Sequence, residues 1–192
     1  MPTETSVSSA DSFFGSARAW CRGRRPELRL LLLLFLAWAG FRQLADPEFY
    51  HIYSGLTLVF HEMGHILFSP FGEVMTVAGG SITQIAIPIV AALLLYRQGD
   101  FYGVAIGGTW LASSMANLSV YVGDARAEEL PLVGFSDDPE HDWNWLLDHF
   151  NALSSDTRLA RLIHDLGGLV LLVSVVFGLW LCLEMWRARG ER

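Results

Sequence analysis

Hydrophobic residues fall into five blocks along the chain, separated by polar segments. The blocks cover residues 28–44, 49–71, 82–96, 101–122 and 163–186. A helix needs about 20 mostly apolar residues to cross a membrane, and the second, fourth and fifth blocks reach that length. The first and third blocks are shorter and need tilt or local thinning of the bilayer. The pattern therefore predicts an all-α polytopic membrane protein with about five transmembrane helices.

The polar segments define the domain organisation. A basic tail covers 1–27, one transmembrane domain covers 28–186, and a short tail covers 187–192. Within the domain, 123–160 is a long acidic connection, predicted to be a solvated loop with a short helix lying on the membrane surface. The first block also resembles a signal peptide with a cleavage site at Ala37-Trp38-Ala39, but the segment before it is long for such a leader.

Composition narrows the class of protein. The chain is 52% hydrophobic and 17% charged, whereas soluble chains are about 25% charged. A disordered protein is excluded, and the net charge of −7 argues against nucleic acid as a partner. Cys21 and Cys182 lie at opposite ends of the chain and imply no disulfide framework. The expected surroundings are the lipid bilayer.

Arginines near the helix ends predict the orientation. The basic tail carries Arg18, Arg22, Arg24 and Arg25, which places the N-terminus in the cytoplasm. Five alternating helices then leave the C-terminus outside, where Arg187, Arg189 and Arg192 are unfavourable. Either one block does not cross the membrane, or the charge rule is broken here.

The motif with the clearest chemistry is His61-Glu62-Met63-Gly64-His65, within the second block. On a helix His61 and His65 share a face one turn apart, so both imidazoles can bind one metal ion. Glu62 lies beside them and can act as the general base toward a metal-bound water. Three ionisable side chains in an apolar helix are costly without such compensation.

A catalytic zinc site usually has three protein ligands, so a third must come from elsewhere. On the fourth block, polar residues recur at helical spacing, and Asn117 and Asp124 share one face. Asp124 is therefore our predicted third ligand, with Asn117 as a substrate or oxyanion hydrogen-bond donor, or as a polar contact between helices. His141 and Asp142 are the alternatives, if the acidic connection folds back.

These residues resemble the site-2 protease type of intramembrane zinc metalloprotease, in particular its short bacterial relatives. The resemblance covers about residues 49–125 and rests on the His61–His65 motif, a following glycine-bearing segment and the Asn117…Asp124 pair. It implies zinc held by two histidines and an aspartate, a glutamate base, and an active site near the cytoplasmic side. The chain departs from it in having no proline between Asn117 and Asp124, and no soluble peptide-binding domain.

A further expectation concerns 73–84, between the second and third blocks. Gly79-Gly80 lies between residues of β character, which is typical of a hairpin turn. In the family that the chain resembles, this region forms a short β-hairpin near the active site. A flexible loop is the alternative.

The sequence thus predicts a zinc-dependent intramembrane endopeptidase that cleaves membrane-embedded proteins, in a bacterial cytoplasmic membrane. The alternatives are a membrane metal-binding or transport protein, which should show ionisable groups strung across the membrane, and a catalytically silent relative of the protease. The intact Glu62 argues against the silent relative.

Overall fold

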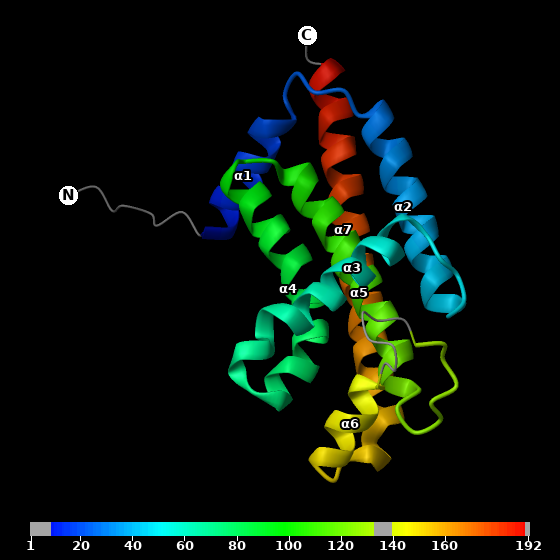
Figure 1. Ribbon diagram of the computed structural model, residues 1–192. Helices are drawn as coiled ribbons and strands as arrows, with labels where there is room; N and C mark the ends of the chain where they lie inside the picture. The colour runs from blue at the N-terminus through cyan, green and yellow to red at the C-terminus, as the bar shows by residue number, and fades with distance from the viewer. Residues whose placement is uncertain (1–8, 133–139, 191–192) are drawn as a thin grey trace, which may run out of the picture.

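The computed structural model describes residues 9–132 and 140–190, and the chain there is helical, as predicted (Figure 1). Seven α-helices follow one another: α1 (Ser9–Cys21), α2 (Glu27–Ala45), α3 (Ile52–Phe68), α4 (Glu73–Arg97), α5 (Phe101–Gly123), α6 (Asp142–His149) and α7 (Asp156–Gly190). Short 3-10 turns at Ser69–Phe71 and Leu153–Ser155 precede α4 and α7.

Three described helices are long and apolar enough to cross a membrane, which supports a membrane protein. They are α2, α4 and the helix Leu153–Gly190, which contains α7. The five predicted crossings are not supported. The second predicted span, α3, has only 17 residues, and α5 lies at the centre of the molecule with many polar and small residues buried among its neighbours.

The predicted hairpin at 73–84 is wrong: these residues form the first half of α4, and the described residues contain no strand. Gly79 packs against α3, where a Cβ added to it would lie 2.6 Å from the carbonyl oxygen of Gly64. A Cβ added to Gly64 would in turn lie 2.2 Å from the carbonyl oxygen of Gly79. The glycines therefore allow two helix backbones to touch, which a sequence pattern does not distinguish from a turn.

Contacts along α2 show how it runs relative to its neighbours. At its start Glu27 pairs with Arg189 near the end of α7, and near its end the Leu44 carbonyl accepts a hydrogen bond of 3.1 Å from His164 near the start of α7. The helices are therefore antiparallel. Tyr102 at the start of α5 donates to the carbonyl of Arg29 near the start of α2, and Gln43 near the end of α2 meets Ser113 further along α5 at 2.7 Å. Hence α2 and α5 run in the same direction.

The next helix, α3, does not turn back. Tyr53 near its start lies 3.4 Å from Thr109 of α5, and Thr57 lies 3.3 Å from Ser114, further along both helices. Hence α3 continues in the direction of α2, and α4 returns antiparallel to both. Figure 1 shows α3 as a short segment joining the lower end of α2 to the foot of α4.

At the other end, α1 packs against α7 and the α4–α5 turn. Cys21, Leu33, Leu181 and Met185 are fully or almost fully buried there, with Phe101 beside them. This core fixes the scaffold, and the candidate site lies at the opposite end, between α3, α4, α5 and α6.

Candidate metal centre

His61 and His65 lie one turn apart on α3 with their rings together, as predicted. The ring centroids are 4.8 Å apart. His61 is buried at 7% exposure, and His65 is partly exposed. Both side chains face α4 and the start of α6, where they meet Gln84, Thr76 and Asp142.

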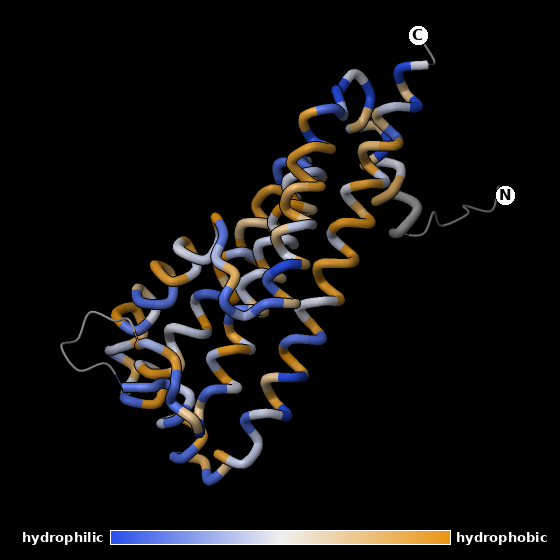
Figure 2. Tube along the Cα trace, turned by 90° about the vertical axis from the view of Figure 1, so that its right-hand side faces the viewer, coloured by the Kyte–Doolittle hydropathy of each residue, from blue (hydrophilic) through white to orange (hydrophobic). Residues whose placement is uncertain are grey.

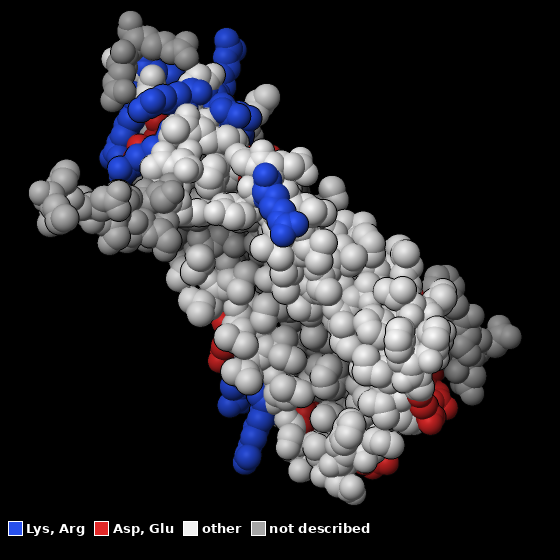
Figure 3. Space-filling view, turned by 90° about the vertical axis from the view of Figure 1, so that its left-hand side faces the viewer, with Lys and Arg blue, Asp and Glu red and all other residues white. Residues whose placement is uncertain are grey.

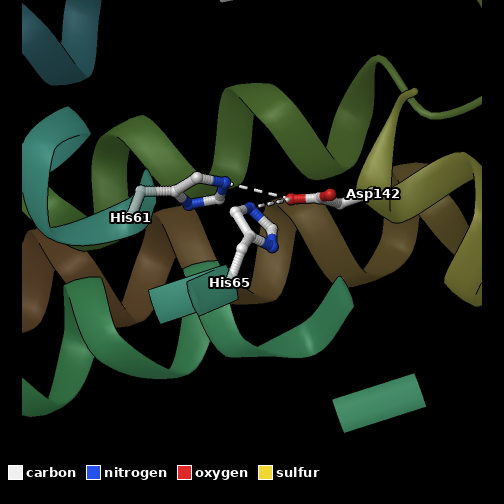
Figure 4. Close-up of side chains that lie close together, drawn as sticks. All are labelled: His61, His65 and Asp142. Atoms are coloured by element: carbon white, nitrogen blue, oxygen red, sulfur yellow. Dashed lines mark hydrogen bonds and ion pairs between the residues drawn. The ribbon is translucent and has the colours of Figure 1, made fainter. Parts of the chain in front are cut away.

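Asp142, the first residue of α6, completes the cluster (Figure 4). Its Oδ2 lies 3.0 Å from His61 Nε2 and 3.3 Å from His65 Nε2. The three ligand atoms all lie within 4.8 Å of one another. Ligand atoms on one tetrahedral zinc at bonds of about 2 Å are separated by roughly 3.3 Å. The donor set and its spacing fit a metal ion with one position left for another ligand.

Hydrogen bonds behind the histidines leave the facing nitrogens free to bind a metal. His65 Nδ1 lies 2.9 Å from the Thr76 carbonyl, which can only accept, so Nδ1 carries the proton. His61 Nδ1 lies 2.7 Å from Gln84 Oε1. The Gln84 amide is oriented in turn, since its Nε2 donates to the Ser114 carbonyl at 3.2 Å. With a metal ion bound, both imidazoles can then turn an unprotonated Nε2 to it, the arrangement that metal-binding histidines need. Without the ion, an Nε2 that carries a proton donates it to the Asp142 carboxylate.

Gly80 of α4 provides the space beside the rings. A Cβ added to it would lie 2.6 Å from His65 Nε2 and 2.7 Å from His61 Nε2. No other residue type fits this position without moving the two ligands.

Asp142 is held by the start of α6. Its backbone N–H donates to the Tyr121 hydroxyl at 3.0 Å, and the neighbouring Trp143 donates from Nε1 to Ser81 Oγ of α4 at 3.0 Å. Burial acts to raise the pKa of the Asp142 carboxyl, but hydrogen bonds with His61 and His65 outweigh it and hold that pKa below its usual value. The group is therefore a carboxylate, as a metal ligand must be.

The structure does not bring Asp124, the predicted third ligand, to the histidines. Helix α5 ends at Gly123, and the Asp124 carboxylate accepts hydrogen bonds from the backbone N–H groups of Glu129 and Leu130 at 3.0 and 3.1 Å. It also faces His141 Nε2 at 3.4 Å. The prediction extended the helical face of Asn117 past the end of the helix, whereas Asp124 holds the connection that delivers Asp142.

His141, the other alternative, is not part of the cluster. Its Nδ1 accepts a hydrogen bond of 3.2 Å from the backbone N–H of Asn144 and caps α6. Because Nδ1 is an acceptor, Nε2 carries the proton toward Asp124. His141 thus supports the residue that follows it.

Glu62 and Asn117 line one cavity of about 640 Å³ together with the three clustered side chains. Neither is fully buried. Glu62 comes from α3 and Asn117 from α5, so the two face the cavity from different helices. These positions are compatible with the predicted roles of Glu62 as the general base and Asn117 as a hydrogen-bond donor to the substrate.

Sequence reasoning missed Gln84, Gly80 and Tyr121. Gln84 carried a signal, since a long amide within an apolar helix needs a partner. Tyr121 follows Asn117 by four positions, on the same helical face of the fourth block.

Comparison with models of protein families, with curated proteins and with solved structures finds no match for this chain.

Proposed function

We propose that the protein is a zinc-dependent intramembrane endopeptidase, similar to the site-2 protease type. The observation that carries the proposal is the convergence of His61, His65 and Asp142 beside the cavity that Glu62 lines. This is the two-histidine, one-carboxylate donor set of zinc hydrolases, with the adjacent glutamate of the motif in reach of the same space.

The three ligands would hold zinc, and zinc would lower the pKa of water to about 7 and polarise a peptide carbonyl. Glu62 takes a proton from the attacking water and passes it to the leaving nitrogen. Asn117, across the cavity, donates a hydrogen bond from its amide to the substrate backbone. Gln84 and the Thr76 carbonyl keep the imidazoles oriented throughout.

The proposed substrate is a membrane protein, and the proposed location is a bacterial cytoplasmic membrane that the chain crosses several times. The apolar residues Leu58, Ile66 and Val120 line the cavity beside its polar centre. Such walls accept an unwound segment with apolar side chains. A helical segment must first unwind, because its carbonyls are shielded by internal hydrogen bonds.

The test compares wild type with Glu62→Gln in reconstituted membranes containing a library of single-pass helices. Glu62→Gln keeps size and metal ligands but cannot accept the proton, so we expect full zinc content and at least about 100-fold slower cleavage. Glu129→Gln is the matched control, because Glu129 is exposed on the loop and does not line the cavity. It should cleave like wild type.

Equal cleavage by wild type and Glu62→Gln would refute the assignment of the base. Full zinc occupancy without cleavage by any variant would favour the alternative, a membrane metal-binding or transport protein.

A further inference from the structure

The start of α2 and the end of α7 lie on the same side of the molecule. Arg189 Nη2 of α7 is 2.8 Å from Glu27 Oε2 at the start of α2. In Figure 1 the C-terminal end of α7 and the first turns of α2 lie together at the top, and α6 lies at the bottom. The candidate metal centre belongs to the lower end, because Asp142 opens α6.

The helix directions require an even number of crossings. Helices α2 and α3 run down in series, α4 runs up, α5 runs down beside it, and α7 runs up. Because α4 ends at the top and α7 starts at the bottom, α5 must cross as the buried central helix. The pair α2–α3 therefore counts as one crossing.

Charge differs sharply between the two ends. The upper end carries most of the described arginines: Arg18, Arg22, Arg24, Arg25, Arg29, Arg97, Arg187 and Arg189. The lower end carries Arg42, Arg126, Arg158 and Arg161, of which Arg42 pairs with Asp46 and Arg126 with Asp156. The lower end carries most of the described acidic residues: Asp46, Glu48, Glu73, Asp124, Glu128, Glu129, Glu140, Asp142, Asp148, Asp156 and Asp165. On the face in Figure 3, blue atoms gather at the upper end and red atoms lie mainly in the lower half.

We propose that the metal centre opens on the non-cytoplasmic side of the membrane and acts on polypeptide segments at that surface. This differs from the site near the cytoplasmic side that the resemblance to the site-2 protease type implies. The choice of a polypeptide substrate rests on the proposed peptidase function. The side of the membrane is inferred from the distribution of arginines. Arginine-rich ends stay in the cytoplasm, so the acidic end with the cluster faces outward. This orientation places Arg187 and Arg189 in the cytoplasm with the basic tail, and so removes the conflict in the sequence-based topology.

The depth of the site agrees with an opening to water. Exposed apolar residues on α7 extend from Leu162 to Trp186, and the part from Leu166 to Trp186 alone covers about 30 Å along the axis, which matches the hydrocarbon thickness. Before Leu166 the helix carries all of its charged residues of the first half, Asp156, Arg158, Arg161 and Asp165, together with the exposed Leu162. Figure 2 shows blue segments at this lower end and a mostly orange middle. Gly123 of α5 packs at Ala160 within this polar stretch.

Tyr121, two residues before Gly123, hydrogen-bonds the backbone of Asp142 at 3.0 Å. The cluster therefore lies level with the polar start of α7, at the outer membrane–water boundary. Water and a chain emerging from the bilayer can both reach this level.

The cavity walls indicate the chemistry of the segment. The charged side chains that line it are those of Glu62, Glu140 and Asp142 together with the imidazoles, and its described lining contains no arginine. The other walls are largely apolar. The expected substrate is a juxtamembrane segment on the outer surface that is apolar and neutral or basic, because an acidic segment would be repelled.

The first test measures only the orientation of the chain in the membrane. Asp148→Cys places a thiol on exposed α6, and Gly190→Cys places one on the exposed end of α7, where a Cβ meets no atom within 4 Å. The native thiols of Cys21 and Cys182 are buried, so wild type is the unlabelled control. In intact bacterial cells a membrane-impermeant maleimide should label Asp148→Cys, and should label Gly190→Cys only after permeabilisation.

The reverse pattern, or equal labelling of both variants in intact cells, would overturn the inference whether or not the protein is a peptidase.

The second test measures from which side of the membrane a peptide reaches the metal centre. Zinc-loaded wild type and Glu62→Gln are placed in right-side-out and inside-out membrane vesicles, with an apolar basic peptide and an apolar acidic peptide added outside. We expect wild type to cleave the basic peptide at least about tenfold faster in right-side-out vesicles than in inside-out vesicles, and faster than it cleaves the acidic peptide. Glu62→Gln should cleave neither peptide. Cleavage confined to inside-out vesicles would overturn the inference. Outward labelling without cleavage in either vesicle would leave the orientation standing and refute the peptidase proposal.

Discussion

At the scale of single residues, the site depends on which aspartate reaches the histidines. His61, Glu62 and His65 could be identified from the sequence because their spacing has a local meaning on one helix. The third ligand could not, because it depends on where α5 ends and how the acidic connection returns. Asp142 follows His61 by 81 positions, and no local pattern specifies such a contact. The structure brings Asp142, one of the two alternatives, to the histidines.

Replacing the two aspartates should therefore give different results. Asp142→Ala removes a ligand, and we expect zinc affinity to fall by more than about 100-fold, which exceeds the usual cost of losing an outer-shell contact. Asp124→Asn keeps an acceptor for the loop N–H groups, and zinc affinity should fall by no more than about tenfold. Metal analysis of protein purified in detergent, titrated against a zinc chelator, measures both. A larger loss in Asp124→Asn would restore Asp124 as the ligand.

At the scale of elements, the hydrophobic blocks predicted the helices from α2 to α5 and α7, but neither α1, which lies in the tail before the first block, nor the contacts between helices. The blocks at 28–44 and 101–122 nearly match α2 and α5. The segment 73–84 was misassigned because a Gly-Gly pair favours both a turn and a close helix contact. Tertiary packing decides between them: α3 and α4 touch at Gly64 and Gly79, and that contact places Gln84 and Gly80 at the histidines.

The contact between α3 and α4 predicts opposite effects for two glycine substitutions on α3. In Gly64→Ala the added Cβ would lie 2.2 Å from the Gly79 carbonyl oxygen, and we expect about 1–3 kcal/mol of destabilisation from overpacking, with loss of zinc. Gly55→Ala, on the same helix with no atom within 4 Å of the added Cβ, should be neutral or stabilise by about 0.4–1 kcal/mol. Thermal melting in detergent compares the two. Equal melting temperatures would show that the helices are not in close contact there.

At the scale of the whole molecule, the topology predicted from hydropathy disagrees with the one predicted from the arginines, and the packing of the helices bears on this disagreement. Five alternating crossings conflicted with the arginines at both ends, and the structure places α2 and α3 in series, with both ends together. Hydropathy reports whether a helix tolerates lipid but not its direction, which is set by its partners. Helix α5 occupies the centre of the molecule but is not among the helices apolar enough to be identified as spans. Its neighbours enclose it, so small and polar residues such as Ser113 and Ser114 replace apolar ones on its surface.

The metal should also stabilise the molecule as a whole, since it would join α3 to the connection between α5 and α6. Removing it leaves only the direct contacts of His61 and His65 with Asp142, so the connection around Glu128 and Glu129 should open more often. At free zinc of about 100 times Kd, binding contributes about 2.7 kcal/mol, which corresponds to roughly 100-fold less opening. A glutamate-specific protease, which can cut at exposed Glu128 and Glu129, should therefore cleave chelator-treated protein up to about 100-fold faster than zinc-loaded protein when opening is fast relative to cleavage.

Two variants separate this effect from a general change in protease susceptibility. Asp142→Ala should be cut rapidly with or without zinc. His149→Ala, which removes an exposed imidazole on α6 outside the cluster, should retain the protection. If zinc binds stoichiometrically yet leaves the cleavage rate of wild type unchanged, the ion does not join α3 to Asp142, and the third ligand must be sought elsewhere.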